Sequence, residues 1–341
     1  MYEKGKGIVV ERPGKAVLKE VYLPKLGNET IVVKTKFSAI SSGTEMNIYN
    51  GITSPLDGTL WYPLIPGYEG VGEIVYVGKD VKGFKIGERV MANNTDGYPD
   101  YCSAWGGQVE YIIKTKEMRA GVECVKIPDN VSYEKSVMVS LAAVAFKGMK
   151  RINIKKEDKV LIIGQGVIGL SALQLFKLKG VKVAVADLYE SRLKISRKFA
   201  DMTINTSKEN LLDKVKEFTD GKLADIVFEA TGNQEIASKT IDFCKDGFSG
   251  ENVGRIHFQG YYPAPMILTA WHHWFGKSPT ITMSCGHDIG RDKILNLISK
   301  GKFNARCMFT KIVNINDAPK AYEEMNKDKA NILKILFRWE A

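Results

Sequence analysis

A glycine-rich turn between a strand and a helix constrains this chain more than any other feature of its sequence. The apolar, β-branched run that begins at Val160 ends at Gly164, and Gly166 and Gly169 complete a G-x-G-x-x-G pattern. An apolar helical pattern follows over 170–178, and the next strand, 181–186, leads into Asp187, eighteen residues after Gly169. Strand, glycine turn, helix, strand and acid in this order predict a parallel βαβ unit of a doubly wound α/β sheet.

The chemistry predicted for this turn is the binding of a dinucleotide. Gly164 permits the tight turn, Gly166 lets the backbone approach a pyrophosphate, and Gly169 lets the helix pack close to the strand. The helix N-terminus presents unpaired N–H groups and a partial positive charge to the phosphates. A carboxylate at Asp187 accepts the adenosine ribose hydroxyls and repels a 2′-phosphate, which favours NAD. The alternative is a glycine turn that binds nothing. The expected pyrophosphate contacts are Gly164, Gly166, Val167, Ile168 and Gly169.

Composition and charge exclude several classes of function. The 341 residues are 44% hydrophobic and 26% charged, as in a globular protein of two domains. No apolar run reaches the roughly 20 residues that span a bilayer. The first residues lack the apolar centre of a signal peptide, so we expect a cytoplasmic protein without a membrane partner. Lysines dispersed among acids give the net charge of +10, which favours anionic ligands or a solvated surface but not nucleic acid.

The spacing of turn residues divides the chain into two predicted domains. Residues 1–140 are expected to form a small, tightly turned β-barrel, with strands at 7–10, 30–37, 70–77, 89–92 and 109–113. A helix over 136–149 is expected at the hinge. Strands and helices then alternate from 158 to about 260, as in a parallel doubly wound sheet. The tail is expected as helices 292–300 and 318–325 and a strand at 332–337.

Several ordered segments resemble the medium-chain dehydrogenase/reductase superfamily, the zinc-type alcohol and polyol dehydrogenases. The matching segments are Ser42-Gly-Thr-Glu45, Pro66-Gly-Tyr-Glu-Gly-Val-Gly72, Gly83-Phe-Lys-Ile-Gly-Glu-Arg-Val90, Gly106-Gly-Gln-Val-Glu-Tyr111, Gly164–Gly169, Asp225-Ile-Val-Phe-Glu-Ala-Thr-Gly232 and Leu333-Lys-Ile-Leu336. The resemblance implies a GroES-like catalytic domain of residues 1–140 and 290–341, and a Rossmann NAD-binding domain of residues 141–289. It also implies a small-molecule alcohol or ketone as substrate and a homodimer or homotetramer.

The chain departs from this family at its zinc positions. Ser42 stands where zinc-type members have cysteine, Tyr68 where they have histidine, and Ser140 at the usual third ligand. Hydroxyl and phenol groups are poor ligands for Zn²⁺, which prefers thiolate, imidazole or carboxylate, and Glu69 alone does not make a site. The region 93–105 contains only Cys102 of the four cysteines of a structural zinc lobe. We therefore expect no zinc of either kind.

Without zinc, another group must handle the proton of the reacting alcohol. Tyr68 is the first candidate because it occupies a former ligand position, as does Ser42, although Tyr68 as mere filling of the vacated cavity is an equal alternative. A phenol with an ordinary pKa near 10 needs a neighbouring cation to act as a base at neutral pH. By resemblance, Thr44 corresponds to the hydroxyl that relays the alcohol proton. Glu69 either orients Tyr68, acts as the acid or base itself, or is simply a buried carboxylate.

Further positions carry over from the resemblance. Arg192 is expected at the adenine edge or on the helix surface, and Thr231 and Gly232 at the carboxyl edge of the sheet, where cofactors lie. Lys334 corresponds to a basic residue that approaches the pyrophosphate. The segment Trp271–Phe275, expected after the last Rossmann strand, is interpreted as a subunit interface or packed core, or else as part of a substrate pocket. His287 lies near the cleft by analogy, where a general base role is the lesser alternative.

These features predict a zinc-independent, NAD(H)-dependent oxidoreductase that interconverts a secondary alcohol and a ketone, with a sugar, polyol or cyclitol as substrate. The motif pair around Ser42 and Tyr68 is similar to a branch that includes bacteriochlorophyllide hydroxyethyl-side-chain dehydrogenases and related sugar or cyclitol dehydrogenases. A tetrapyrrole hydroxyethyl group is therefore a sharper alternative substrate. Two functions of different classes also fit the same features: a quinone or enoyl reductase, and a non-catalytic, nucleotide-responsive binding protein.

Overall fold

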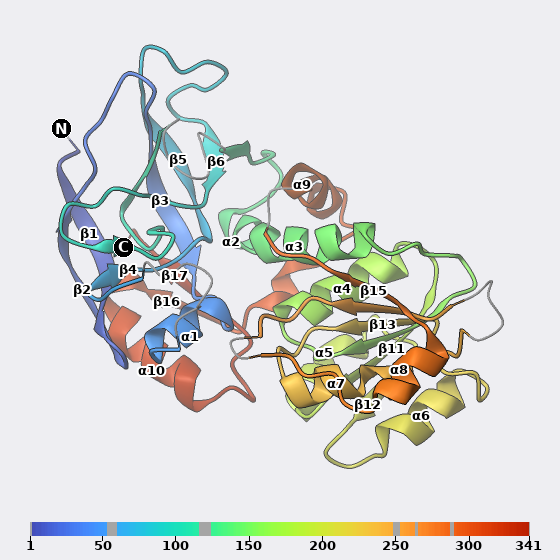
Figure 1. The fold of residues 1–341 in the computed structure, drawn as a ribbon. Helices are drawn as coiled ribbons and strands as arrows, with labels where there is room; N and C mark the ends of the chain where they lie inside the picture. Colours follow the sequence, from blue (N-terminus) through green and yellow to red (C-terminus); the bar gives the residue numbers. More distant parts are fainter. Residues whose placement is uncertain are drawn as a thin grey trace. The chain divides into compact units, whose positions relative to one another are not determined.

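The chain folds into two compact units, drawn in Figure 1 from a computed structural model that describes residues 2–52, 60–115, 124–247, 253–262, 265–286 and 290–340. Unit 1 comprises residues 1–140, 295–301 and 305–341, and unit 2 comprises residues 141–294 and 302–304. The sequence predicts divisions after residues 140 and 289. The expected class, a doubly wound parallel sheet plus a β-rich domain, is confirmed.

Unit 2 is built on a six-stranded parallel sheet with the strand order β12-β11-β10-β13-β14-β15. The central strands have almost no exposed side chains, as expected where helices cover both faces of a parallel sheet. The order reverses between β10 and β13, which creates the switch point at which α/β sheets bind ligands. The strands are β10 (Lys159–Ile163), β11 (Lys182–Asp187), β12 (Met202–Asn205), β13 (Ile226–Glu229), β14 (Arg255–Phe258) and β15 (Thr280–Met283).

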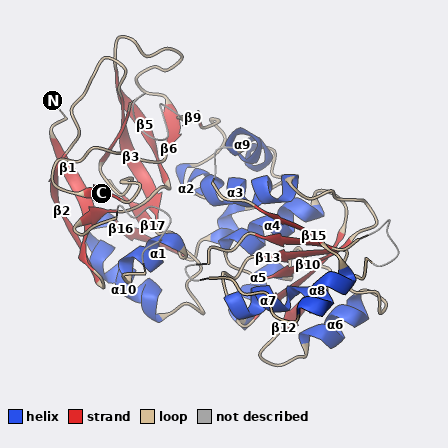
Figure 2. Cartoon of the chain, viewed as in Figure 1, coloured by secondary structure: helices blue, strands red, loops and turns tan. Residues whose placement is uncertain are grey.

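Helices connect these strands by crossovers, which are right-handed. The helices that lead toward β12 therefore cover one face of the sheet, and those that lead toward β15 cover the other, as α4 and α7 do in Figure 2. The prediction of β14 as the last strand is wrong. Trp271–Phe275 lies in a helix, and β15 follows it as the sheet's edge. The helices are α4 (Val167–Lys177), α5 (Glu190–Ser196), α6 (Leu211–Phe218), α7 (Gln234–Phe243) and α8 (Trp271–Lys277).

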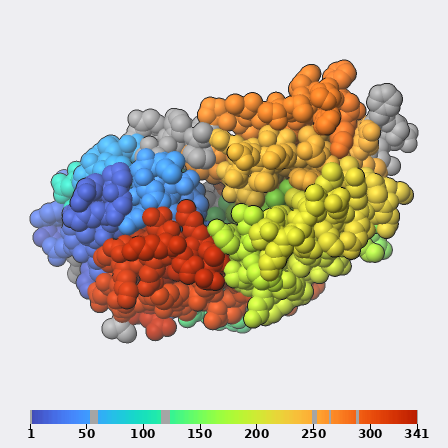
Figure 3. Space-filling model, turned by 90° about the horizontal axis from the view of Figure 1, so that it is seen from below, coloured from blue at the N-terminus to red at the C-terminus, as the bar shows by residue number. Residues whose placement is uncertain are grey.

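Unit 1 contains two sheets, one with the order β2-β1-β4-β7 and one with the order β16-β17-β3-β5-β6-β9, with β8 paired to β3. The C-terminal strand β17 pairs antiparallel with β3, so the tail closes the sheet begun by the N-terminal half. In Figure 3 the C-terminal segment lies beside the N-terminal residues. The strands are β1 (Lys4–Arg12), β2 (Lys15–Tyr22), β3 (Ile31–Ala39), β4 (Leu64–Ile65), β5 (Gly70–Val77), β6 (Arg89–Ala92), β7 (Cys102–Ser103), β8 (Tyr111–Lys114), β9 (Val125–Lys126), β16 (Lys311–Asn314) and β17 (Ile335–Arg338).

The remaining helices differ slightly from expectation. The single helix predicted over 136–149 is two helices, α2 (Tyr133–Val137), capped by the Ser132 side chain, and α3 (Val139–Lys150). The others are α1 (Thr44–Tyr49), α9 (Arg291–Ser299) and α10 (Ala318–Lys327). Among the described residues no helix combines the length and the apolar character that crossing a membrane requires.

Candidate active site

The glycine-rich turn of unit 2 has the geometry that its sequence predicts. Gly164 has φ +90°, and a Cβ there would lie 2.8 Å from the Thr231 side chain, so only glycine fits. A Cβ on Gly169 would lie 1.8 Å from the Gly164 carbonyl oxygen, because α4 packs directly on the turn. Above Gly166 there is open space for at least 4 Å. The turn is therefore tight where it meets the protein and open where a ligand would approach.

Asp187 holds this turn in place from the end of β11. Its carboxylate accepts hydrogen bonds from the backbone N–H of Gln165, at 2.6 Å, and of Tyr189, at 2.8 Å. Arg192 lies 3.7 Å from the same carboxylate and 4.9 Å from the centre of the Tyr189 ring. Each carboxylate oxygen has a second lone pair, so ribose hydroxyls can still be accepted. Gln165 is a site residue that sequence reasoning missed.

Glu229, at the end of β13, was also missed, although it stands in the quoted motif. It accepts a hydrogen bond from the Thr231 backbone N–H at 2.6 Å, and others from the Thr231 and Tyr262 hydroxyls. Burial raises its pKa. Because Thr231 packs on Gly164, Glu229 links the loop after β13 to the glycine turn and to the loop after β14. Gly232 follows with φ +71°.

These residues of unit 2 fit a dinucleotide. Val167 and Ile168 occupy the first turn of α4, whose cap residue is Gly166, so their N–H groups have no intrahelical acceptor. The open space over Gly166 meets the helix N-terminus, where an anion is stabilised. The carboxylate of Asp187 stands at the neighbouring strand end. Phosphate and ribose positions are thus matched by three independent features.

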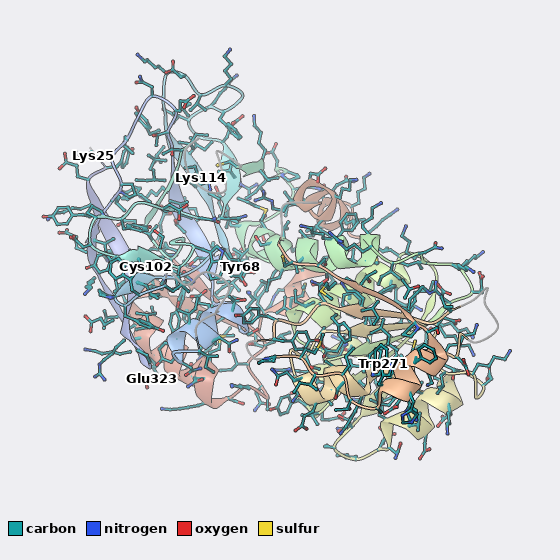
Figure 4. All side chains as sticks on the ribbon, in the orientation of Figure 1. Lys25, Tyr68, Cys102, Lys114, Trp271 and Glu323 are labelled. Carbon is teal, nitrogen blue, oxygen red and sulfur yellow. The ribbon has the colours of Figure 1, made fainter. Side chains whose placement is uncertain are left out.

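In unit 1 the structure brings three hydroxyl groups together around Tyr68, which is labelled in Figure 4. The Tyr68 and Ser41 hydroxyl oxygens lie 2.5 Å apart, and Thr44, the first residue of α1, also bonds the phenol. Burial raises the pKa of Tyr68 well above its usual value, and the neighbouring Glu69 raises it further. The phenol is therefore neutral at physiological pH, so it serves as a hydrogen-bond donor and not as a phenolate base.

Ser41, and not Ser42, is the serine at this position. The turn between β3 and α1 directs the buried Ser41 side chain inward and leaves Ser42 exposed. The expectation for Ser42 rested on alignment with a former metal ligand, and the structure corrects it by one residue. The sequence has no signal that distinguishes these two adjacent serines, because the backbone conformation of the turn decides which side chain points inward.

Lys334 requires a second correction. Its ammonium group is fully buried and forms an ion pair with Glu69, so it is not available to a pyrophosphate. Lys334 lies just before β17, which pairs with β3. This pairing brings Lys334 close to the start of β5, the strand that follows Tyr68 and Glu69. Burial raises the pKa of Glu69 and Lys334 opposes that rise. Glu69 is thus a buried carboxylate with its own counter-ion, the plainer of the roles considered for it.

Glu45 is a buried carboxylate that was not predicted. It accepts hydrogen bonds from the Ser41 backbone N–H at 3.2 Å, from the Gln108 side chain at 3.2 Å and from the Tyr322 hydroxyl. Burial raises its pKa to about 7, and these hydrogen bonds only partly offset the effect. Glu45 therefore fixes the backbone of Ser41, the residue that holds Tyr68.

The residues at the family's zinc positions do not fit Zn²⁺. The Tyr68 phenol is neutral and bonded to Ser41, Glu69 is paired with Lys334, and the Ser140 hydroxyl donates to Asn93 at 3.4 Å. Of these groups only Glu69 is of a type that zinc favours, which are thiolate, imidazole and carboxylate, and its carboxylate is paired with Lys334. Within the described part of the chain no three His, Cys, Asp or Glu residues converge as a metal-binding group.

The aromatic segments serve different roles. Trp105 packs edge-on against Tyr68, with ring centres 5.2 Å apart. On α8, Trp274 is buried, whereas Trp271 and Phe275 are exposed, and Figure 4 labels Trp271. The segment Trp271–Phe275 therefore packs into the core on one face of α8 and is exposed to solvent on the other. His287 lies outside the described residues.

Comparisons with known proteins agree with this architecture. The family model "Alcohol dehydrogenase GroES-like domain" matches residues 27–129, and "Zinc-binding dehydrogenase" matches residues 167–289. An L-threonine 3-dehydrogenase of Photorhabdus laumondii is 29% identical, covering 93% of this chain and 94% of the relative. A D-xylulose reductase of Morganella morganii is 25% identical over 93% and 96%. The alcohol dehydrogenase structure from Thermus sp. ATN1 shares the fold, with a TM-score of 0.83, 22% identity and coverage of 98% and 99%.

The pKa of Glu45 predicts a pH-dependent loss of stability. The folded chain retains the Glu45 proton up to about pH 7, whereas the unfolded chain releases it near its ordinary value of 4.5, so the free energy of unfolding falls as pH rises between them. Glu45→Gln should remove on the order of 2–3 kcal/mol of that fall. Urea unfolding at about pH 5 and about pH 7.5 measures it. Exposed Glu235→Gln is the control, and equal slopes in all three proteins would refute the assignment.

Proposed function

The chain belongs to the medium-chain dehydrogenase/reductase superfamily, as an enzyme of its alcohol dehydrogenase type, and on that basis we propose that it is a zinc-independent, NAD(H)-dependent oxidoreductase that interconverts a secondary alcohol and a ketone. The observation that carries the proposal is the cluster of Tyr68, Ser41 and Thr44 hydroxyls, in which Tyr68 stands at a position where zinc-type members have a histidine ligand. A sugar, polyol or cyclitol is the proposed substrate, since a relative bears the name D-xylulose reductase.

The nucleotide half of the proposal rests on Asp187 and the glycine turn. A bound nicotinamide nucleotide would supply the group that exchanges a hydride with the alcohol or ketone. Gly166 and the N-terminus of α4 would hold its pyrophosphate, and Asp187, which fixes the turn through the Gln165 N–H, would hold its adenosine ribose. A 2′-phosphate would bring further negative charge to this carboxylate, which is the physical reason for proposing NAD(H).

The proton half rests on the neutral phenol of Tyr68. During ketone reduction the phenol donates its hydrogen bond to the carbonyl oxygen and stabilises the negative charge that develops there. As that proton transfers, Tyr68 accepts another from the Thr44 hydroxyl, and the partly exposed Thr44 recovers a proton from water, while Ser41 keeps its proton and its hydrogen bond to the phenol oxygen. Oxidation runs through the same steps in reverse. No phenolate forms, which suits a buried phenol beside the carboxylate of Glu69.

We expect NADH to bind at least about tenfold more tightly than NADPH, a difference of about 1.4 kcal/mol. Asp187→Asn keeps the size of the side chain but removes its charge, so it should narrow this preference by about the same factor. Fluorescence titration with both nucleotides provides the measurement. Asp201→Asn, which alters another strand-flanking acid that binds a backbone N–H, is the control. Equal affinities in the wild-type protein would contradict the role of Asp187.

Tyr68→Phe should lower kcat by about 10²–10⁴-fold, the usual contribution of a positioned acid or base, without changing NADH affinity. Tyr98→Phe is the matched control, because it removes another buried phenol hydroxyl, one that bonds the Gly106 carbonyl outside the cluster. Because the raised pKa keeps Tyr68 protonated, ketone reduction should show no loss from phenol ionisation up to about pH 10. Near-normal turnover of Tyr68→Phe would assign Tyr68 to packing.

We also propose that the exposed aromatic face of α8 is where subunits of a homodimer or homotetramer meet. Trp271 and Phe275 lie one helical turn apart and are 67% and 72% exposed, and β15, the edge strand that follows α8 in the chain, carries Met283, which is 58% exposed. Apolar side chains grouped in this way mark interaction sites. A Trp271→Lys, Phe275→Lys variant should reduce the mass found by light scattering, to that of one chain for a homodimer and to that of a dimer for a homotetramer. Trp61→Lys, at an exposed tryptophan of unit 1, should not. An unchanged mass in the double variant would exclude this face.

A further inference from the structure

Trp105 has a backbone conformation that a tryptophan rarely adopts. Its φ is +67°, in the left-handed region, where a bulky side chain costs about 1–3 kcal/mol and glycine costs nothing. Such conformations persist only where the surrounding structure enforces them, and they gather at functional sites. Trp105 stands beside Tyr68, the residue proposed to handle the proton. The position would be cheaper for glycine, so the ring itself requires an explanation.

Two parallel strands bring Trp105 to Tyr68. β4 and β7 pair through Leu64 with Cys102 and Ile65 with Ser103, so both strands end at one edge. Tyr68 follows β4 by three residues and Trp105 follows β7 by two. Parallel strands that end together place the residues just beyond them side by side. The ring centres are accordingly 5.2 Å apart, at an interplanar angle of 67°.

Hydrogen bonds on both sides of Trp105 enforce its conformation. The Ile65 carbonyl accepts from Ala104 N–H at 2.9 Å and from Gly106 N–H at 3.1 Å. The Trp105 carbonyl accepts from Thr95 N–H at 2.9 Å. A Cβ on Gly106 would lie 2.1 Å from the Thr95 carbonyl oxygen, so Gly106 is packed tightly against that backbone. The loop therefore cannot relieve the conformation of Trp105 by moving Gly106. The backbone that carries the indole is therefore held firmly, as the support of a recognition group must be.

The exposure of the ring indicates what it does. Trp105 packs against the hydrophobic cluster of β1, α1 and α10 but is only partly buried, whereas Tyr68 is buried. A tryptophan needed only for packing would have its whole ring buried in the core. Here Trp105 stays partly exposed, and its ring packs against the ring of Tyr68, whose hydroxyl would meet the substrate. An aromatic surface of this kind offers contact area at little conformational cost.

We infer that Trp105 is a specificity-determining residue, and that its indole selects a cyclic polyol by packing against the C–H face of the substrate ring beside the reacting hydroxyl. This inference rests on the proposed function and narrows its substrate class. A polyol ring presents a rigid apolar face next to its hydroxyl groups. An open-chain polyol must lose rotational freedom to present one, so it benefits less from the same indole.

The test compares myo-inositol with D-sorbitol, which have the same numbers of carbons and hydroxyls but differ in ring closure. Initial rates of NADH formation should give a higher kcat/KM for the cyclic polyol in the wild-type protein. Trp105→Gly accommodates the positive φ without strain and removes the ring, so it should reduce this cyclic preference at least about tenfold, mainly through KM. Trp105→Phe should retain part of it. Thermal unfolding verifies that each variant folds.

Leu223→Gly is the control, because Leu223 also has a positive φ, +63°, but belongs to unit 2, whereas Tyr68 and Trp105 belong to unit 1. It should relieve strain without changing the cyclic preference. An unchanged preference in Trp105→Gly, or a wild-type preference for sorbitol, would overturn the inference.

Failure of the proposed function would be recognised separately. If wild-type protein binds NADH but oxidises neither polyol, the proposed reaction fails, and calorimetric titration of the NADH complex with myo-inositol then decides the inference. Binding that Trp105→Gly weakens at least about tenfold would support it, equivalent to about 1.4 kcal/mol. No binding by the wild-type protein, or equal binding by both, would overturn it.

Discussion

A hydrogen bond between the hydroxyls of Tyr68 and Ser41 organises the polar interior of unit 1. Ser41 is fixed through its backbone by Glu45, and Glu45 is bonded to Gln108 and Tyr322. Gln108 accepts a hydrogen bond from Ser38 at 2.6 Å, and Ser38 in turn accepts one from Trp339 at 2.8 Å. The network joins β3, α1 and α10 to the C-terminal tail. The proposed catalytic hydroxyl is therefore held by residues from both ends of the chain.

Burial of two carboxylates next to one phenol sets the electrostatics of this interior. Glu69 is paired with Lys334, a neutralisation that an enclosed charge requires, because an unpaired buried ion is strongly destabilising. Glu45 has neutral donors instead, so burial raises its pKa toward neutrality. Burial raises the pKa of Tyr68, and the neighbouring Glu69 raises it further, which keeps the phenol neutral. A neutral donor suits stabilisation of a carbonyl oxygen better than abstraction of an alcohol proton.

The features that could be predicted from the sequence are local ones. The turn Gly164–Gly169 and its acid Asp187 are specified by backbone conformation and close packing over a short span, and the structure has them where expected. The contacts of Lys334 depend on the pairing of β17 with β3, some three hundred residues away in sequence, which no local pattern encodes. Ser41, and not the expected Ser42, contacts Tyr68, because the backbone conformation of one turn decides which of the two side chains points inward. β15 was missed because its largely exposed residues lack the apolar signal of an inner strand.

The pairing of β4 with β7 shows the same limit at the site itself. Each strand has two residues, too few for a periodic pattern, yet their parallel pairing brings Trp105 to Tyr68. The positive φ of Trp105 is equally invisible in the sequence, since no residue type there suggests it. Sequence reasoning therefore located the glycine-rich turn well and the hydroxyl groups around Tyr68 only in part. Long-range pairings complete the second site.

The central claim is that hydroxyl groups perform in this chain the work that zinc performs in its relatives. Elemental analysis of the purified, catalytically active protein tests it most directly, together with turnover after dialysis against a strong chelator. The account predicts far less than one zinc per chain and turnover unchanged by the chelator. One tightly bound zinc per chain, with turnover lost on its removal and restored by its return, would contradict it.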